Sequence, residues 1–339
     1  MLSRELNIYH HNEEFVLESG LCLPELKIGY HTYGNFNPAK SKVVWVCHAF
    51  TANSDVFDWW QGLFGENSFF NPDEYFIICA NKIGSCYGST GPLSLNPLTG
   101  NPWFHTFPEI SIRDMVNAHE ILRKHLGIEK IHTVTGGSTG GHQALEWAIM
   151  NPDIHDHLIC LANHAKASPW SIAFSQSQRM AIEADQSWKE DHPKAGERGL
   201  AAARSIALLS YRNYQTYLET QSEETNEKTN DFRAVSYQVY QGEKLIKRFN
   251  AYSYMVLLNA LDSHNIGRKR GNIDDVLASV SAKTLIIGIV SDYLFPLREQ
   301  IYLSERIPGA TFAAIESLYG HDGFLIETDK IKTAIGRFY

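Results

Sequence analysis

A serine stands at the apex of a glycine-rich segment that could present its hydroxyl as a nucleophile. The segment, residues 136–140 (Gly-Gly-Ser-Thr-Gly), follows a β-branched run at 131–135 and precedes a helix-forming run at 141–150. A strand, a sharp turn and a helix lift such a hydroxyl above the edge of a sheet, where a base and a substrate carbonyl both reach it. Glycine suits the turn because side chains at the flanking positions would clash. The pattern predicts nucleophilic catalysis by Ser138.

The same segment could instead hold a phosphate at a helix N-terminus, or simply pack tightly without any chemistry. It lacks the Gly-Lys-Ser/Thr ending of a P-loop. It also lies deep in the chain, whereas dinucleotide sites occur at the first strand–helix unit. A nucleotide-binding turn is therefore disfavoured.

A serine hydroxyl needs a base to become nucleophilic, and the base needs an acid to orient it. In α/β-hydrolases the chain order is serine, acid, histidine, with the acid after a late strand and the histidine after the last one. Asp292 follows the apolar run at 284–290, and His321 follows the run at 311–315. We therefore expect Ser138, Asp292 and His321 to form a catalytic triad.

Other residues fit the acid and base positions less well. Asp322 competes with Asp292, but as the neighbour of His321 in the chain it cannot easily reach the far side of that ring. The remaining candidates lie outside the expected loops: Asp262, Asp275, His142, His164 and His264.

Acyl transfer also needs backbone N–H groups that face the negative charge developing on the carbonyl oxygen. One donor should come from Thr139, directly after the nucleophile, and another from the loop after the third strand. That loop is residues 48–52, and we expect Phe50 to be the second donor. Losing one such donor typically lowers turnover by roughly 10²–10³.

The order of apolar and amphipathic runs predicts the architecture that positions these residues. Several short runs are apolar on both faces, as in a covered parallel sheet. An amphipathic helix pattern at 112–126 ends at Gly127. Alternation of strands and helices predicts a doubly wound α/β sheet. The strands are expected at residues 43–47, 75–79, 131–135, 158–161, 284–290 and 311–315.

The alternation breaks between residues 165 and 265, where only helical patterns occur. A polar span at 219–231 should be solvated and mobile. We expect residues 1–164 and 266–339 to form the sheet domain, and 165–265 to form an inserted helical lid. The lid helices are expected at residues 172–184, 199–217 and 252–261.

Composition limits the classes of function. The 339 residues are 44 % hydrophobic and 20 % charged, which is ordinary for a globular protein. A net charge of −8 argues against general binding to nucleic acid or to an anionic membrane surface. We find no membrane-spanning run and no signal peptide at the N-terminus. Five scattered cysteines then predict a cytoplasmic protein with reduced thiols.

Over nearly its whole length the chain resembles the homoserine O-acyltransferase family, which includes the homoserine O-acetyltransferases and has the α/β-hydrolase fold. The resemblance implies an α/β-hydrolase fold with an inserted helical lid subdomain. Together the matching segments are far more specific than the serine turn alone. They lie at residues 48–51, 59–63, 81–92, 112–115, 136–147, 199–204, 240–244, 291–296 and 319–322.

This resemblance implies transfer of an acyl group from acyl-CoA to the hydroxyl of L-homoserine through an acyl-serine, in methionine biosynthesis. Acetyl-CoA is the favoured donor over succinyl-CoA, and no permanently bound cofactor or metal is expected. In the family a lid arginine and tyrosine hold the carboxylate of the acceptor, and the aspartate after the catalytic histidine holds its ammonium group. The matching residues are Arg204, Tyr211 and Asp322, with Arg179 as a lesser candidate. A homodimer formed through the lid helices is also expected.

The chain departs from the family pattern around the expected pocket. Thr139 and His142 stand where methionine is usual, Phe50 where leucine is usual, Ala52 where glycine is usual and Gly323 where alanine is usual. Thr139 and Phe50 still supply backbone N–H groups, so the mechanism is retained while the shape of the acyl pocket changes.

Three alternatives to homoserine acylation follow. One is an acyltransferase acting on serine or another alcohol, and the second is a serine esterase that uses water. The third is a non-catalytic binding protein, which an intact triad disfavours. The basic run at 267–271 could attract CoA phosphates, although a solvated loop is the better interpretation.

Overall fold

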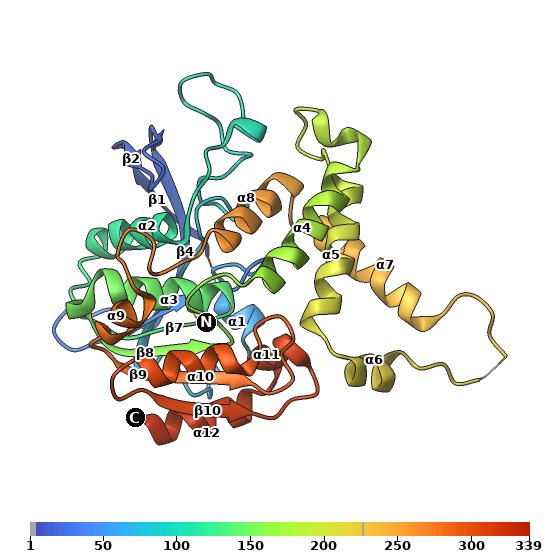
Figure 1. The fold of residues 1–339 in the computed structure, drawn as a ribbon. Coiled ribbons are helices and arrows are strands. Elements are labelled where there is room, and N and C mark those ends of the chain that lie inside the picture. The colour runs from blue at the N-terminus through green and yellow to red at the C-terminus, as the bar shows by residue number, and fades with distance from the viewer. Residues whose placement is uncertain (1–4, 226) are drawn as a thin grey trace.

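An eight-stranded sheet with helices on both faces forms the body of the protein (Figure 1). The computed structural model describes residues 5–225 and 227–339. Residues 1–4, part of the N-terminus at which no signal peptide is expected, and residue 226 of the polar span lie outside it. The strand order is β1-β4-β6-β5-β7-β8-β9-β10. The strands from β6 to β10 pair in parallel, and β4 is antiparallel to both of its neighbours. Their bounds are β1 Asn7–His11, β4 Leu26–Tyr33, β5 Lys42–Cys47, β6 Tyr75–Ala80, β7 Ile131–Gly137, β8 His155–Leu161, β9 Lys283–Ile289 and β10 Thr311–Ile315, beside a separate hairpin of β2 Phe15–Val16 and β3 Cys22–Leu23.

The central strands bury both faces, which explains why their sequences lack apolar–polar alternation. In β5, Trp45 belongs to one core cluster, whereas Val44 and Val46 belong to the cluster on the other face. This arrangement confirms the predicted doubly wound α/β fold. Helices α2 Ile112–His125, α3 Thr139–Met150, α9 Ile273–Ala278 and α10 Leu297–Arg306 contribute to the first cluster, and α1 Val56–Trp59, α11 Gly323–Ile326 and α12 Thr328–Phe338 to the second.

All six strands expected from the apolar runs exist, with ends that differ by up to three residues. The prediction missed β1 and β4 because it searched for continuous apolar runs. Strand β4 instead alternates between buried and partly exposed positions, as its antiparallel place near the edge of the sheet allows.

Residues 165–225 and 227–265 contain helices and no named strand, and an antiparallel bridge between Lys166 and Asn265 closes the base of the segment. Helix α4 packs on α5 and α5 packs on α7, while α6 and α7 extend away from the sheet (Figure 1). No helix in the described part of the chain is both long and apolar enough to cross a bilayer. The helices are α4 Pro169–Glu183, α5 Glu197–Tyr211, α6 Tyr214–Gln221, α7 Arg233–Ile246 and α8 Ala251–Asp262.

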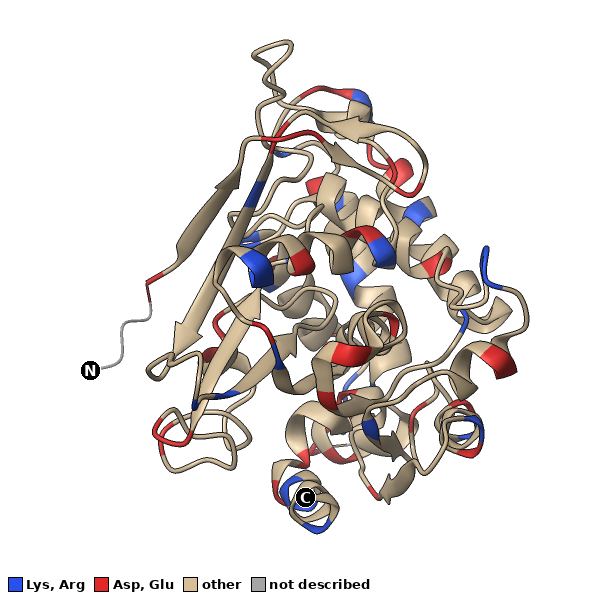
Figure 2. Ribbon diagram, turned by 90° about the vertical axis from the view of Figure 1, so that its left-hand side faces the viewer, with Lys and Arg blue, Asp and Glu red and all other residues tan. Residues whose placement is uncertain are grey.

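Two details of this region differ from the prediction. The single helix expected over 199–217 is wrong, because α5 ends at Tyr211 and the Asn213 side chain accepts a hydrogen bond from the backbone N–H of Thr216 to cap α6. Helix α7 was not expected. Its apolar residues Val235 and Val239 are more than half exposed, so they do not belong to a buried helix face. Acidic and basic residues are intermixed over the elements visible in Figure 2, as the modest net charge indicates.

The serine turn depends on a close approach between β5 and α3. A Cβ atom on Gly140 would come closer than 3.0 Å to the carbonyl oxygen of Cys47. A Cβ atom on Gly136 would also come closer than 3.0 Å to the backbone of Gly140. Ser138 itself has a φ of 58° and a ψ of −126°, a conformation that non-glycine residues adopt only under strain. The glycines are therefore required by the closeness of the two elements.

Replacing Gly140 with alanine should destabilise the fold by about 1–3 kcal/mol or more, because the new methyl group forces β5 and α3 apart. Gly336→Ala is the matched control: in α12 its Cβ would meet nothing nearer than 3.7 Å, so it should be neutral or stabilise by up to about 1 kcal/mol. Urea unfolding measures both. Equal free energies of unfolding for the two variants would contradict the packing account.

Candidate active site

Ser138, Asp292 and His321 come from separate strand ends at one edge of the sheet. Ser138 follows β7, Asp292 follows β9, and His321 lies in a single 3₁₀ turn, Gly320–Asp322, after β10. Their exposed fractions are 7 %, 4 % and 3 %. The carboxyl ends of parallel strands are where ligands bind in open α/β sheets. The three residues predicted from chain order thus converge on one location.

The buried carboxylate of Asp292 orients the imidazole of His321. Nδ1 of His321 donates a hydrogen bond to Oδ2 of Asp292 at 2.6 Å. Oδ1 of Asp292 accepts from the backbone N–H groups of Leu294 and Phe295, at 2.8 and 2.9 Å. Asp292, and not the competing Asp322, is therefore the acid that fixes the ring and its tautomer.

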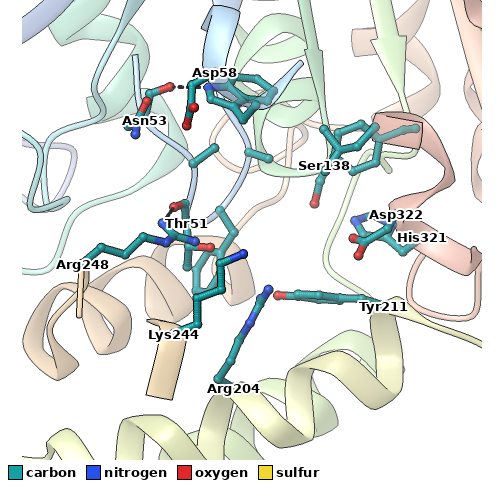
Figure 3. Close-up of a pocket in the computed structure, with 16 residues that line it drawn as sticks. Thr51, Asn53, Asp58, Ser138, Arg204, Tyr211, Lys244, Arg248, His321 and Asp322 are labelled. Carbon is teal, nitrogen blue, oxygen red and sulfur yellow. Dashed lines mark hydrogen bonds between the residues drawn. The ribbon is translucent and has the colours of Figure 1, made fainter. Parts of the chain in front are cut away.

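The opposite nitrogen of His321 is free to act as a base. Nε2 is buried and has no hydrogen-bond partner among the described residues. Ser138 and His321 line the same cavity of about 400 Å³, and Figure 3 shows the Ser138 hydroxyl pointing into it on the side of His321. The Ser138 hydroxyl forms no hydrogen bond with Nε2 in this structure, but both groups border the same cavity.

Burial opposes the charged form of His321, but the charge of Asp292, its hydrogen bond and the charge of Asp322 raise the pKa of His321 above its usual value. Catalysis by a general base needs the neutral ring. The rate should therefore rise with pH as His321 loses its proton.

Of the two residues expected to supply oxyanion donors, Phe50 lines the cavity, and Thr139 directly follows Ser138, which also lines it. Thr139 is the first residue of α3. The N–H groups in the first turn of a helix have no carbonyl partner within that helix. Neither N–H group donates to a backbone carbonyl among the described residues.

The far wall of the cavity carries three cations from the lid helices and the turn after α7. They are Arg204, Lys244 and Arg248 (Figure 3), and none forms an ion pair within the described part of the chain. Nε of Arg204 is buried without a hydrogen-bond partner there, and the guanidinium lies 5.5 Å from the centre of the Tyr211 ring. Of these three cations the sequence predicted Arg204 alone. Lys244 could have been found, because it ends the segment 240–244 that resembles the family.

Asp322 reaches the cavity but already has a partner. Its Oδ2 lies 2.8 Å from Nη1 of Arg212, a residue that the sequence did not predict. Tyr211 lines the cavity with its ring centre 5.8 Å from that of His321, and burial raises the pKa of Tyr211 to about 12. Its hydroxyl is therefore a donor throughout the physiological range.

Two basic features considered from the sequence lie elsewhere. Arg179 pairs with Asp262 at 2.5 Å and does not line the cavity. Arg268 and Arg270 pair with Glu18 at 2.7 Å and Glu146 at 2.5 Å. Two arginines of the basic run at 267–271 are thus held by ion pairs, while Lys269 between them is exposed.

Three buried histidines form the described group most suited by distance to a metal. Ligand atoms of His142, His164 and His264 all lie within 4.8 Å of one another, a cluster hidden from the sequence by their wide separation. Their ring planes are within 34° of one another, with interplanar angles of 29°, 34° and 27°. Lone pairs lie in the ring planes, so they do not converge on one ion as tetrahedral ligation requires. Burial lowers the pKa of all three residues, and we interpret them as neutral packed imidazoles.

The fold and site together define an α/β-hydrolase: the family model described as "alpha/beta hydrolase fold" matches residues 42–328. A homoserine O-acetyltransferase from Cyclobacterium marinum is 48 % identical over 98 % of this chain and 94 % of its own length. The crystal structure of a homoserine O-acetyltransferase from Bacillus anthracis aligns over 98 % of this chain and 97 % of that one, with a TM-score of 0.90 and 24 % identity. The crystal structure of esterase E22 aligns over 100 % of both chains, with a TM-score of 0.89 and 24 % identity. At 24 % identity the two structures show the fold alone.

Within that fold, the chain belongs to the homoserine O-acetyltransferase family. The resemblance noted in the sequence is confirmed, as is its implication that the protein is an acyltransferase enzyme. The curated relative is matched along nearly its full length.

Asp292→Asn should lower the rate of Ser138 acylation by roughly 10⁴-fold, the size of effect seen when a triad aspartate is replaced by asparagine. It also removes the carboxylate charge that raises the pKa of His321, so the acid limb of the residual activity should move to lower pH. The burst of p-nitrophenol from p-nitrophenyl acetate measures both quantities. Asp322→Asn is the control and should move that limb less, because Asp322 is the smallest of the named causes. An unmoved limb in Asp292→Asn would contradict the assignment.

Proposed function

We propose that this protein is an acyl-CoA:L-homoserine O-acyltransferase that prefers acetyl-CoA and works through an acyl-enzyme on Ser138. The observation that carries the proposal is one cavity lined by Ser138, by the Asp292-bound His321 and by the unpaired Arg204. A nucleophile, a base and a carboxylate-binding group are thus within reach of the same small ligand.

In the first half-reaction, Nε2 of His321 takes the proton of the Ser138 hydroxyl while its oxygen attacks the thioester carbonyl. The N–H groups of Phe50 and Thr139 stabilise the oxyanion. The carbon–sulfur bond then breaks, the sulfur takes the proton from His321, and CoA leaves as a thiol. Ser138 is left as an acyl ester.

The second half-reaction repeats the chemistry with homoserine. Its hydroxyl gives a proton to His321 and attacks the ester carbonyl. The bond between that carbon and the Ser138 oxygen breaks, and Ser138 recovers the proton. O-acyl-homoserine leaves, and the enzyme is unchanged, which makes the mechanism ping-pong.

Arg204, Tyr211 and Asp322 would orient the acceptor. The unpartnered Nε of Arg204 suits a carboxylate, because a guanidinium binds one with two parallel hydrogen bonds. The Tyr211 hydroxyl would donate to the same group. The Asp322 carboxylate would share its charge between the substrate ammonium and Arg212, which holds it in place.

Lys244 and Arg248 support an anionic donor. Once Arg204 binds the acceptor carboxylate, these two cations at the cavity wall remain without acidic partners among the described residues. The phosphates of acyl-CoA supply the missing charge. The relatives' names favour acetyl over succinyl, since those matched are acetyltransferases.

A serine esterase is the second candidate, favoured by the similarity to esterase E22. The two functions differ in the acceptor that resolves the acyl-enzyme. An esterase needs no group for an amino-acid carboxylate, and the orphaned Arg204 has no role in hydrolysis.

We also propose that residues 165–265 fold as a lid over the sheet domain and that two copies meet through it. Apolar side chains on α6 and α7 support the dimer: Tyr214, Leu218, Val235, Val239 and Tyr240 are all at least 46 % exposed. Such a patch on a monomer usually marks an interface. A cytoplasmic location and a place in methionine biosynthesis remain predictions from the sequence.

Incubation with acetyl-CoA alone should add one acetyl group to the protein, and Ser138→Ala should abolish the addition, because the serine oxygen is the nucleophile. Intact-protein mass spectrometry measures it. Subsequent L-homoserine should remove the group and yield O-acetyl-homoserine. An adduct that persists in Ser138→Ala places the nucleophile elsewhere, whereas acetate as the sole product in the presence of homoserine favours the esterase.

Arg204→Ala should raise the KM for homoserine by roughly 10-fold or more, since a charged hydrogen bond contributes about 1.5–3 kcal/mol. The rate of Ser138 acylation by acetyl-CoA should change little. Arg179→Ala is the matched control, a lid arginine paired with Asp262 away from the cavity. Equal homoserine KM values in the two variants would remove Arg204 from the site.

Val239→Asp should convert a dimer to a monomer at micromolar concentration, because it places a charge in the apolar patch of the lid. Leu98→Asp changes a residue that is 77 % exposed in a loop outside the lid, and it should leave the dimer intact. Sedimentation velocity distinguishes the species. A monomeric wild-type protein would rule out the interface.

A further inference from the structure

Lys82, in the loop after β6, is buried beneath the serine turn. Only 1 % of the residue is exposed, and it forms no ion pair with the described residues. Its Nζ instead donates hydrogen bonds to the carbonyl oxygens of Ala49 at 3.0 Å and Phe50 at 3.1 Å, and to Oγ1 of Thr139 at 3.3 Å. Lysine is almost never fully buried without an acidic partner, so this placement calls for a functional explanation.

The titratable groups around Lys82 are neutral at pH 7. Burial raises the pKa of the thiols of Cys47 and Cys79, from β5 and β6. Burial also lowers the pKa of His48, His119 and His142, from the loop after β5, α2 and α3. Lys82 is therefore the one member of this buried set that can carry charge at neutral pH.

The hydrogen bonds of Lys82 determine where the Phe50 N–H points. The carbonyl of Ala49 and the N–H of Phe50 belong to one peptide unit, which is planar and trans. These two groups therefore point in opposite directions. Nδ1 of His48 and Nζ of Lys82 both bind the Ala49 oxygen, at 2.9 and 3.0 Å. Since Lys82 lies behind the loop and residues 49–53 line the cavity, the N–H is directed into the cavity.

The same amine also holds the second expected donor residue. Thr139 begins α3, and its hydroxyl accepts from Nζ of Lys82. The backbone of Lys82 is fixed in turn, because its N–H donates to Nε2 of His48 at 3.2 Å. One buried side chain thus links the loop after β5 to the N-terminus of α3.

We propose that Lys82 is a positioning residue that assembles the oxyanion hole by tying Phe50 and Thr139 together, and that its ammonium charge strengthens the hole from behind. This inference rests on the proposed acyl transfer at Ser138. Fixed dipoles and charges aimed at a developing oxyanion lower the barrier without reorganisation. Lys82 contacts no substrate and acts through the two donor residues.

Protonation of Lys82 gives the proposal a pH signature. An ammonium group has three N–H donors, which match the three oxygens around it. Burial lowers the pKa of Lys82 to about 7, against the opposing effects of Cys47 and Cys79. The charge is present below that pKa and is lost as pH rises through it. The acylation rate should therefore rise with pH through His321 and fall again through Lys82.

The test compares Lys82→Met, which keeps the apolar stem, with Lys82→Gln, which keeps an NH₂ donor without the charge. Leu122→Ala is the control for lost stability, because it leaves a cavity at the buried face of α2 without changing Lys82. The burst of p-nitrophenol from p-nitrophenyl acetate measures Ser138 acylation from pH 5.5 to 9.5, and Ser138→Ala sets the background. Circular dichroism and melting temperatures report folding, and homoserine KM is measured with acetyl-CoA.

Lys82→Met should lower the acylation rate by roughly 10²–10³, as for loss of an oxyanion donor, with little change in homoserine KM and no alkaline limb. Lys82→Gln should retain more of the rate but also lack that limb, and it decides the question if Lys82→Met does not fold. Acylation within threefold of wild type in the folded variant, with the alkaline limb intact, would overturn the proposal. The burst needs no homoserine, so it still tests Lys82 if homoserine proves not to be the acceptor.

Discussion

The carboxylate of Asp292 is an anion in a nearly water-free interior, and the geometry of the cavity depends on how it is satisfied. Burying an unpaired ion costs several kcal/mol. Two backbone N–H groups from the following turn and Nδ1 of His321 offset that cost. The buried carboxylate needs all three hydrogen bonds, and this need fixes the positions of all three donors. The loop after β9 cannot move without losing two of them, and His321 cannot turn without losing the third, so Nε2 stays directed at the cavity.

Opposite charges separate across the cavity. The sheet side provides His321, held from behind by the buried Asp292, whereas the far wall provides Arg204, Lys244 and Arg248. Because Arg204 and Lys244 lie on helices inserted between β8 and β9, the sheet supplies the chemistry and the inserted segment supplies the groups that suit anionic substrates. This division matches the α/β-hydrolase fold, in which one catalytic frame serves many reactions and the site sets the substrate.

The sequence predicted the fold most reliably where local patterns suffice. Apolar runs identified the six parallel strands, and the order of serine, acid and base indicated which of their ends carry the candidate triad. Patterns failed where the reason lies in tertiary packing. Helix α7 presents exposed apolar residues, and β4 alternates near the edge of the sheet. Arg212, Lys244, Arg248 and Lys82 acquire their positions from elements distant in the chain. The pairing of Lys82 with the backbone of Ala49 requires the register of β5 against β6, which no local pattern contains.

The order in which substrates and products bind tests the acyl-enzyme account most directly. Initial rates of CoA release should be measured while acetyl-CoA and L-homoserine are varied against each other. Because CoA must leave before homoserine reacts, double-reciprocal plots should be parallel, with exchange of labelled CoA into acetyl-CoA in the absence of homoserine. Intersecting lines without that exchange would mean direct transfer between the two substrates. That result would contradict a covalent intermediate on Ser138.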